Sequence, residues 1–423
     1  MFLLYICGMR ISVIAIGDEL LLGEVTDTNS GFLARTIAPA GWSVARVSIV
    51  PDNAEAIYRA IERAFEDTDI VITTGGLGPT KDDITLDTLC CFFRCGRRFD
   101  DGVAANVERV MARRGRAVNE LTRAQAIVPD AACIIQNRVG TAPIMWFEPE
   151  GTGRVLVAMP GVPFETEQMF CSEVFPRLLA RFASDVTVTH RSMIVVDISE
   201  SAIAETLSDL EADLPDGLHL AYLPCVGYVR LRLDAVHRDG AYANGLADRH
   251  AGLIAERLGS HVISREDVVP ARLLLSLLAA KEKSVATAES CTGGNIAHEL
   301  TLIPGASAVM KGGVVAYDNE VKKALLGVGD GTLASHGAVS IEVVEQMAVG
   351  VCRATGASVG IATSGIAGPG GGSADKPVGT VCIAVAVDGR VATSRRYRFA
   401  GNRSRVIDSA TAAALVDACK CLS

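Results

Sequence analysis

The sequence has few aromatic residues, no excess of basic charge and no long apolar run. Aromatic side chains make up 5% of the 423 residues, whereas hydrophobic residues reach 49% and glycines number 41. This composition excludes a largely disordered chain and is typical of α/β domains packed with small aliphatic side chains. The length predicts two to four domains.

Charge and hydropathy restrict the expected partners. The net charge of −9 argues against nucleic-acid binding, which needs a basic face. No apolar run approaches the roughly 20 residues that span a bilayer. The opening MFLLYICGMR has no basic residue before its apolar run, and that run is shorter than a typical signal core. We therefore expect a cytoplasmic protein that binds neither nucleic acid nor membranes.

The 12 cysteines do not follow the spacing of a metal site. Cys90, Cys91 and Cys95 form a cluster, but no second pair or histidine doublet completes a zinc signature. Reduced thiols are expected.

Three regions follow one another along the chain. Residues 10–170 alternate strands such as ISVIAIG and DIVITTGG with helices, which predicts a mostly parallel sheet covered on both faces. Residues 171–265 predict a small α+β module with a hairpin in HLAYLPCVGYVRLRLDAV. Residues 271–423 alternate again, with strands expected in SVATA, GGVVAY, ASVGIATSG, TVCIAVAV and TSRRYRFAG. The fold class predicted for the chain is α/β.

The segment TAESCTGG, residues 287–294, predicts a strand-to-helix turn with reactive side chains. Ser290, Cys291 and Thr292 would lie at the start of the following helix. Unpaired N–H groups and the positive end of the helix dipole can hold an anion or a developing oxyanion there. The alternative is a serine or threonine that caps an ordinary helix.

A serine beside a lysine suggests nucleophilic catalysis. A lysine that is kept neutral by desolvation can take the proton of a serine hydroxyl. Lys322 is the best candidate base because Tyr317, Asp318 and Asn319 precede it after an expected strand. A solvated charge on a helix is the alternative for Lys322. Cys291 is the less favoured nucleophile, since His298 is the one histidine in the neighbouring motifs and is expected to face along its helix.

Several motifs of residues 271–423 resemble the C-terminal domain of the CinA family, the competence/damage-inducible proteins. They are TAESCTGG, GGVVAYDNEVKKALLGV, LASHGAVS, SGIAGPGGGSADKPVGTV and the GNR after the last strand. The family includes nicotinamide mononucleotide deamidases, so the resemblance implies hydrolysis of nicotinamide mononucleotide to nicotinate mononucleotide and ammonia, without a cofactor.

The resemblance also implies roles for individual residues. It places the reactive hydroxyls on Ser290 and Ser307 and the lysine on Lys322, with either serine as the nucleophile and the other in a Ser-Ser-Lys relay. The implied substrate contacts are Tyr317, Thr363, Ser364, Gly365 and, for the phosphate, Arg403.

A second glycine-rich turn, TTGGLGPTKDDITLD, follows the third expected strand. Its glycines Gly75, Gly76 and Gly78 lack the GxGxxG spacing of a dinucleotide fold. The turn can cradle a phosphate and hold a divalent cation, and the oxygen-bearing residues expected to take part are Thr80, Asp82, Asp83 and Glu19. The alternative is that Asp82 or Asp83 caps the following helix.

This turn, with NRVGTAPIMWFE and AMPGVPFETEQMF, resembles the three-layer molybdopterin-binding-like domain of CinA proteins. The resemblance covers residues 10–170 and implies a metal-dependent ADP-ribose pyrophosphatase, with Mg²⁺ or Co²⁺ held by Glu19, Asp82 and Asp83. In other proteins the same fold binds molybdopterin or moves adenylate, so the fold alone does not determine the chemistry.

The middle region resembles the KH-like linker module of full-length CinA proteins. It lacks a basic GxxG loop, so we expect a spacer that contributes to a homodimer and no RNA clamp. The sequence as a whole predicts an enzyme of pyridine nucleotide recycling that acts on nicotinamide mononucleotide and ADP-ribose. The alternative is a nucleotide- or pterin-binding scaffold protein, linked to competence or DNA damage, with an inactive N-terminal site.

Overall fold

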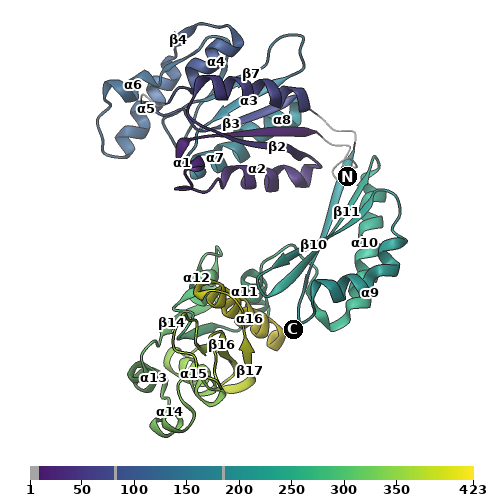
Figure 1. Cartoon of the computed structure of the whole chain (residues 1–423), viewed down its shortest axis with the longest axis vertical. Helices are drawn as coiled ribbons and strands as arrows, with labels where there is room; N and C mark the ends of the chain where they lie inside the picture. Colours follow the sequence, from purple (N-terminus) through teal and green to yellow (C-terminus); the bar gives the residue numbers. More distant parts are fainter. Residues whose placement is uncertain (1–8, 81–82, 183–185) are drawn as a thin grey trace. The chain divides into compact units, whose positions relative to one another are not determined.

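The computed structural model describes residues 9–80, 83–182 and 186–423, so Asp82 lies outside the described residues. Three large sheets and their helices follow one another along the chain, and β4 and β5 form a further two-stranded sheet (Figure 1). Each part is described by itself. None of the described helices is both long and apolar enough to cross a bilayer.

The N-terminal part is built on a six-stranded sheet. Four strands are parallel and two are added antiparallel at one edge. In spatial order they are β2 (Ser43–Val50), β1 (Arg10–Ile16), β3 (Ile70–Thr74), β8 (Val155–Met159), β7 (Ile144–Phe147) and β6 (Cys133–Ile135).

Helices cover both faces of this sheet, which confirms the predicted three layers. Residues of β1 alternate between two apolar cores: Ile11 and Val13 lie in one, and Ile14 and Ile16 lie in the other. The first core includes residues of α2 (Asn29–Ile37), α7 (Pro163–Met169) and α8 (Phe175–Arg181), and the second includes residues of α3 (Ala54–Asp67) and α4 (Thr85–Phe93). The short helix α1 (Asp18–Leu21) follows β1, and β4 (Arg97–Phe99), α5 (Asp101–Arg113), α6 (Glu120–Ala124) and β5 (Ile127–Pro129) form a peripheral element.

The N-terminal core extends beyond residue 170. A π-helical turn, Phe170–Val174, joins α7 to α8, and Phe170, Val174 and Leu178 are fully buried in the first core. The helical segment that begins at Pro163 therefore belongs to this part up to Arg181.

The middle module has a four-stranded sheet and two helices, as its sequence predicts. The strand order is β10 (Leu218–Cys225), β11 (Tyr228–His237), β9 (Thr187–Val195) and β12 (Val262–Ser264), and the helices are α9 (Glu200–Ala212) and α10 (Gly240–Leu258).

The C-terminal part is a five-stranded mixed sheet. The strand order is β14 (Met310–Val315), β13 (Val285–Glu289), β15 (Val359–Gly365), β16 (Thr380–Val387) and β17 (Arg390–Arg398). The first three strands are parallel, and β16 and β17 run antiparallel to their neighbours. Two residues, Asp388 and Gly389, connect β16 to β17, too few for the crossover that a parallel pair needs.

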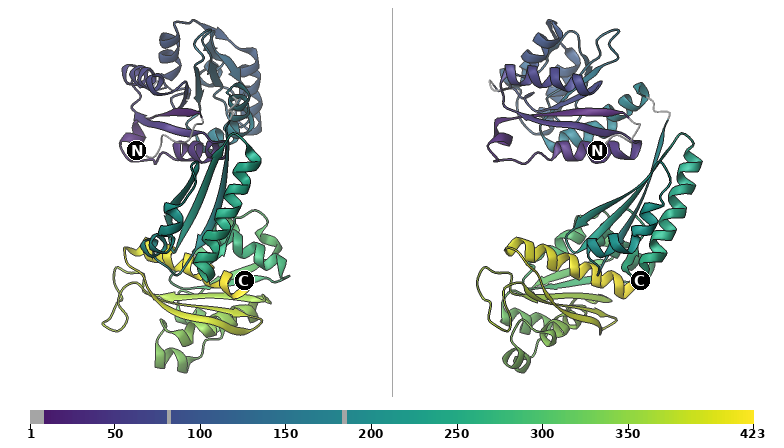
Figure 2. Two further views of the ribbon diagram at one scale, coloured as in Figure 1. Left: turned by 90° about the vertical axis from the view of Figure 1, so that its right-hand side faces the viewer. Right: turned by 45° about the vertical axis from the view of Figure 1, so that its right-hand side comes forward.

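Helices also cover both faces of this second large sheet. Figure 2 shows α16 lying along one face. Leu274, Ile296 and Ala414 pack in the core on that face, and Leu326 and Met347 pack in the core on the other. The helices are α11 (Pro270–Ala280), α12 (Asn295–Thr301) and α16 (Arg403–Leu422) on the first face, and α13 (Asn319–Leu326), α14 (Asp330–His336) and α15 (Ile341–Thr355) in the remainder of this part.

Candidate functional site

The carboxyl ends of three neighbouring parallel strands bring the TAESCTGG turn and the Lys322 region together. The Ser290 N–H donates to the Thr363 carbonyl at 2.9 Å, and the Ala316 N–H donates to the Glu289 carbonyl at 2.8 Å. These bonds join the ends of β13, β15 and β14 at one edge of the sheet. Ligands of open α/β sheets bind at this edge.

A carboxylate occupies the start of α12. The buried side chain of Glu289, which is 1% exposed, accepts hydrogen bonds from the N–H groups of Gly294, Ile296 and Ala297 at 2.9–3.0 Å. These donors are therefore satisfied within the protein. The N–H groups at the start of α12 are therefore not available to a ligand anion, and the alternative of a serine or threonine cap is wrong.

Lys322 is buried and held by two backbone carbonyls. Its side chain is on α13 and is 1% exposed, and Nζ donates to the Ala316 carbonyl at 2.8 Å and to the Tyr317 carbonyl at 3.2 Å. Burial lowers the pKa of Lys322, and this effect outweighs the opposing attraction of the Asp318 carboxylate. The alternative of a solvated helix charge is therefore wrong.

The hydrogen bonds of Lys322 orient its lone pair. A neutral amine has two N–H donors and one lone pair, and the two carbonyls accept from both donors. In its neutral form, Lys322 would therefore keep a lone pair that can accept a proton. This is the state that a general base requires.

Hydroxyl groups near this edge differ in what they already bind. The hydroxyls of Thr292 and Thr363 hydrogen-bond to each other at 2.7 Å, and the Ser364 hydroxyl donates to the Ala338 carbonyl at 2.7 Å. In the described part of the chain, the Ser290 hydroxyl has no such partner. It is therefore the hydroxyl at this edge that is available for chemistry.

Ser307 lies at the opposite end of the sheet. It is exposed in the short 3-10 turn Ala306–Ala308, just before β14, whose first residue pairs with Val285 while its last pairs with Glu289. Four residues of strand separate these ends, a distance of about 13 Å. The predicted relay between Ser290 and Ser307 is therefore not formed within one chain.

Tyr317 and Arg403 lie together beside the same edge. The Arg403 guanidinium donates to the Gly368 carbonyl at 2.7 Å and to the Tyr317 hydroxyl at 3.0 Å. The Tyr317 side chain is 62% exposed. A guanidinium carries five N–H donors, so Arg403 keeps donors for a phosphate at the mouth of the site.

The Cys291 thiol is unsuited to act as a nucleophile. Burial raises the pKa of Cys291 to about 12, with the nearby Glu289 carboxylate adding to the effect. The reactive thiolate is therefore scarce near neutral pH. This agrees with the sequence analysis, in which Cys291 is the less favoured nucleophile.

The second candidate site is a cavity of about 560 Å³ at the carboxyl ends of β1, β3 and β8. Every described residue that the sequence assigned to this site lines it: Gly75, Gly76, Gly78, Thr80, Glu19 and Asp83. The remaining prediction, Asp82, lies outside the described residues.

Two glycines are required by close backbone approach in this cavity. Gly75 has φ +105°, and a Cβ there would lie 2.2 Å from the Ile16 carbonyl oxygen. A Cβ on Gly76 would lie 2.0 Å from the Thr85 hydroxyl oxygen. The end of β3 can approach the end of β1 only without a side chain at Gly75, and Gly76 leaves room for the Thr85 side chain at the start of α4.

Asp83 closes the glycine loop. Its carboxylate accepts hydrogen bonds from the Gly78 N–H at 2.6 Å and the Thr80 N–H at 2.9 Å, and from the Thr80 hydroxyl. No side chain caps the start of α4. The alternative in which Asp83 caps that helix is therefore wrong.

The cavity wall is acidic. Its described lining contains no lysine or arginine, but five carboxylates, which are Glu19, Asp27, Asp52, Asp83 and Glu165. Burial raises the pKa of Asp52, and the Asp18, Glu19 and Asp83 carboxylates raise it further. Such a wall favours a bound cation.

The carboxylates fit a divalent ion that is shared with a phosphate ligand. Among the described residues, no three carboxylate, histidine or cysteine side chains are grouped closely enough to hold an ion alone. Mg²⁺ usually binds through one or two carboxylates together with phosphate oxygens. Glu19 and Asp83 would hold such an ion, which would neutralise phosphate charge.

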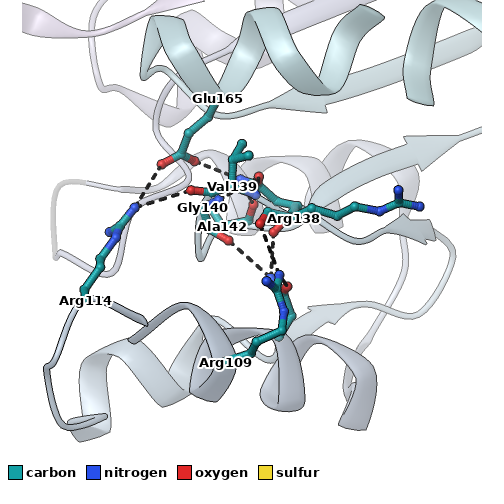
Figure 3. Close-up of polar contacts among 9 residues, drawn as sticks. Arg109, Arg114, Arg138, Val139, Gly140, Ala142 and Glu165 are labelled. Carbon is teal, nitrogen blue, oxygen red and sulfur yellow. Dashed lines mark hydrogen bonds and ion pairs between the residues drawn. The ribbon is translucent and has the colours of Figure 1, made fainter. Parts of the chain in front are cut away.

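The loop of residues 137–142 contributes Thr141 and Ala142 to the cavity lining and is held by several hydrogen bonds. Figure 3 shows Arg109 and Arg114 reaching it from one side and Glu165 from the other. Arg109 donates to the Arg138 carbonyl at 3.1 Å, and Arg114 donates to the Val139 carbonyl at 3.4 Å. The loop is fixed further by the fully buried side chain of Asn137, which donates to Ala142 and Glu165 and accepts from Val139 and Gly140.

Three family models match consecutive parts of the chain. The probable molybdopterin binding domain matches residues 12–180, the damage-inducible protein CinA KH domain matches residues 190–264, and the CinA C-terminal domain matches residues 269–422. The chain belongs to the CinA family. This membership and the three-part α/β architecture were both predicted from sequence.

Relatives named CinA-like proteins align with this chain over nearly its whole length. A CinA-like protein of Gemmatimonas aurantiaca is 42% identical over 94% of this chain and 93% of the relative. A CinA-like protein of Salinibacter ruber is 40% identical over 98% of this chain and 100% of the relative. Among solved structures, a competence/damage inducible protein of Agrobacterium tumefaciens is 41% identical and covers 35% of this chain and 90% of its own, with a TM-score of 0.34.

Some residues of the two sites were not assigned a role from sequence. Glu289 was noted without a function, and Asp52 and Asn137 were not singled out. For Glu289, the available signal was an acidic residue shortly before an expected helix start. Asn137 makes four hydrogen bonds that depend on loop geometry, and no sequence pattern reveals them.

Proposed function

We propose that the C-terminal domain hydrolyses the carboxamide of nicotinamide mononucleotide to give nicotinate mononucleotide and ammonia. The observation that carries the proposal is the buried Lys322 amine, whose two carbonyl partners leave its lone pair free at the edge that holds Ser290. A neutral lysine next to a serine activates acyl transfer.

The reaction proceeds in two balanced steps. The Ser290 oxygen attacks the carboxamide carbon while Lys322 accepts the hydroxyl proton. Lys322 then gives this proton to the leaving nitrogen, which departs as ammonia and leaves an ester on Ser290. Water attacks the ester carbon while Lys322 accepts one of its protons, and Lys322 returns this proton to the Ser290 oxygen as the ester bond breaks. The carboxylic acid product then loses its proton to solvent.

Backbone groups of the turn can stabilise the oxyanion. In the described part of the chain, the N–H groups of Cys291 and Thr292 donate to no backbone carbonyl. They directly follow Ser290, where the oxygen of a tetrahedral intermediate forms. The proposed oxyanion donors are therefore the N–H groups of Cys291 and Thr292 in the turn. They precede the N–H groups at the start of α12 that already donate to Glu289.

The two serines provide the test of this proposal. With nicotinamide mononucleotide as substrate, the wild-type protein should release ammonia and nicotinate mononucleotide, and EDTA should leave the rate unchanged. Ser290→Ala should lower kcat by about a thousandfold or more. Ser307→Ala, at the far end of the sheet, should stay within about fivefold of wild type, since it contacts neither reacting group.

Two results would contradict the assignment. Absence of ammonia release by the wild-type protein would remove the deamidase proposal. Full activity of Ser290→Ala together with loss of activity in Ser307→Ala would transfer the nucleophile to Ser307.

For the N-terminal domain we propose a metal-dependent ADP-ribose pyrophosphatase. The acid-lined cavity supports this second function, because a diphosphate can enter such a wall only together with cations. Formation of AMP from ADP-ribose with Mg²⁺ or Co²⁺, and its absence with EDTA, tests it. Binding of a nucleotide without turnover would favour the alternative of a binding protein.

Divalent cations should stabilise the N-terminal domain in the absence of nucleotide. At about 100 times the dissociation constant, Mg²⁺ should raise the free energy of unfolding by about 2.7 kcal/mol. The pKa of Asp52 is higher in the folded than in the unfolded protein. The contribution of Asp52 to the free energy of unfolding is therefore fully present below its unfolded pKa and is lost as pH rises through its folded pKa. The gain from Mg²⁺ should therefore be larger at pH 7.5 than at pH 5.

Thermal unfolding of the wild-type protein and of Asp52→Asn measures this effect. The asparagine oxygen can still accept from the Asp18 N–H, so the loop is kept while the charge is removed. We expect Asp52→Asn to be more stable than wild type without cations and to respond less to Mg²⁺. An equal response of both proteins at both pH values would exclude these carboxylates as the cation site.

A further inference from the structure

A second cavity lies on the other side of the glycine loop in the N-terminal domain. Its volume is about 210 Å³. It shares with the acid-lined cavity the loop residues from Gly76 to Thr80, together with Asp83 and Gln125. The two cavities therefore adjoin the same loop.

The second cavity differs from the first in the chemistry of its wall. Most of its remaining side chains are apolar: Leu86, Leu121, Ala124, Ile127, Pro143 and Met145. Two charged side chains complete it, Arg97 and Asp87, and they form an ion pair at 2.6 Å. Such a wall suits a flat uncharged ring and offers little to a polyhydroxyl sugar.

Gln125 lines both cavities and carries a hydrogen-bond acceptor that has no partner in the described chain. The side chain is 8% exposed, and its Nε2 donates to the Leu77 carbonyl at 3.3 Å. Its Oε1 is buried and has no partner among the described residues. A buried acceptor without a donor is costly, so a site that keeps one is suited to a ligand that supplies the donor.

We propose that the second cavity binds the base of a nucleoside diphosphate and that Gln125 Oε1 accepts a hydrogen bond from the exocyclic amine of adenine. The inference rests on the function proposed for the N-terminal domain, in which the diphosphate and its cation occupy the acid-lined cavity. The glycine loop, which has no side chain at Gly76 and Gly78, separates the base from the diphosphate. The site should therefore prefer adenine, which has an amine, over hypoxanthine, which has an oxygen at the same position.

The test compares ADP with IDP, which share the diphosphate and differ at this position of the base. Binding is measured by calorimetry in the presence of Mg²⁺ for the wild-type protein, Gln125→Met and Gln136→Met. The wild-type protein should bind ADP about tenfold more tightly than IDP, because the hypoxanthine oxygen places an acceptor against Gln125 Oε1. Gln125→Met should bind both nucleotides with affinities within about twofold of each other, since it has no acceptor.

Gln136→Met is the matched control. Gln136 also has a buried Oε1 without a partner in the described chain, but it lines neither cavity. It should keep the wild-type preference for ADP. If Gln136→Met lost the preference as Gln125→Met does, the effect would be one of general packing and the assignment of Gln125 would fall.

The remaining outcomes separate this inference from the proposed function. If the wild-type protein cleaves ADP-ribose but binds ADP and IDP equally, or if Gln125→Met keeps the preference, the base site is overturned while the pyrophosphatase stands. If 2′-deoxy-ADP binds about tenfold more weakly than ADP and the base makes no difference, Gln125 reads the sugar and the inference is wrong. If the wild-type protein neither binds ADP nor cleaves ADP-ribose, both fall together.

Discussion

Replacement of Lys322 by methionine should lower kcat for deamidation of nicotinamide mononucleotide by about a thousandfold or more, with little change in KM. Methionine fills a buried channel of similar length but has no lone pair able to take the proton from Ser290. Among the described residues, the Lys322 amine hydrogen-bonds to the Ala316 and Tyr317 carbonyls and not to Arg403, so its loss should leave the proposed phosphate contact in place. The measurement is steady-state ammonia release.

The adjacent residue gives the control for this prediction. Lys323 is on the same helix but forms ion pairs with Glu320 and Asp330, so Lys323→Met should keep wild-type kcat. Near-normal activity of Lys322→Met would exclude the lysine as the base.

The pH profile of the wild-type enzyme provides an independent test of the same role. In the proposed role, Lys322 acts only when deprotonated, and burial lowers its pKa. The rate should therefore rise with pH and level off below the ordinary lysine pKa of about 10.4. A rate that is independent of pH between 6 and about 10 would contradict a lysine base.

Replacement of Glu289 by alanine should have the largest effect on stability. It removes one carboxylate that accepts from three N–H groups at the start of α12, and these donors are left without partners next to buried Ile296. Charge-assisted hydrogen bonds of this kind predict a loss of about 4 kcal/mol in the free energy of unfolding. Denaturant unfolding followed by fluorescence or circular dichroism measures it.

The same substitution should also disturb catalysis, because Glu289 directly precedes Ser290. Glu289→Gln, which keeps one acceptor oxygen, should show a smaller loss than alanine. Glu299→Ala on the same helix serves as the control, since the described chain gives the Glu299 carboxylate no hydrogen bond, and its loss should stay within about 0.5 kcal/mol. Equal stability of Glu289→Ala and wild type would show that solvent satisfies these N–H groups.

Much of the fold could be predicted from local patterns. The apolar runs predicted β1, β3, β13 and β15, and glycines after them marked the strand ends where both sites lie. This works because a buried parallel strand is apolar on both faces, so it is recognised without knowledge of its neighbours. The antiparallel edge strands were less predictable, since their direction depends on the length of the connection.

For both candidate sites, the sequence predicted which types of residue take part but not which groups those residues contact. The placement of Ser307 depends on the register of β14 against β13, and no local pattern specifies that register. Glu289 and Asp83 are both carboxylates near a glycine turn, but one caps a helix start and the other closes a loop. Side-chain direction decides between such roles, and it is set by tertiary packing.

The acidic wall of the N-terminal cavity makes ligand affinity depend on a second solute. If cation and nucleotide meet at Glu19 and Asp83, each must raise the affinity of the domain for the other by the same factor, as thermodynamic linkage requires. The fraction of the domain that holds nucleotide then depends on the concentration of free divalent cation. A measured nucleotide affinity of this domain has meaning only together with the cation concentration at which it was obtained.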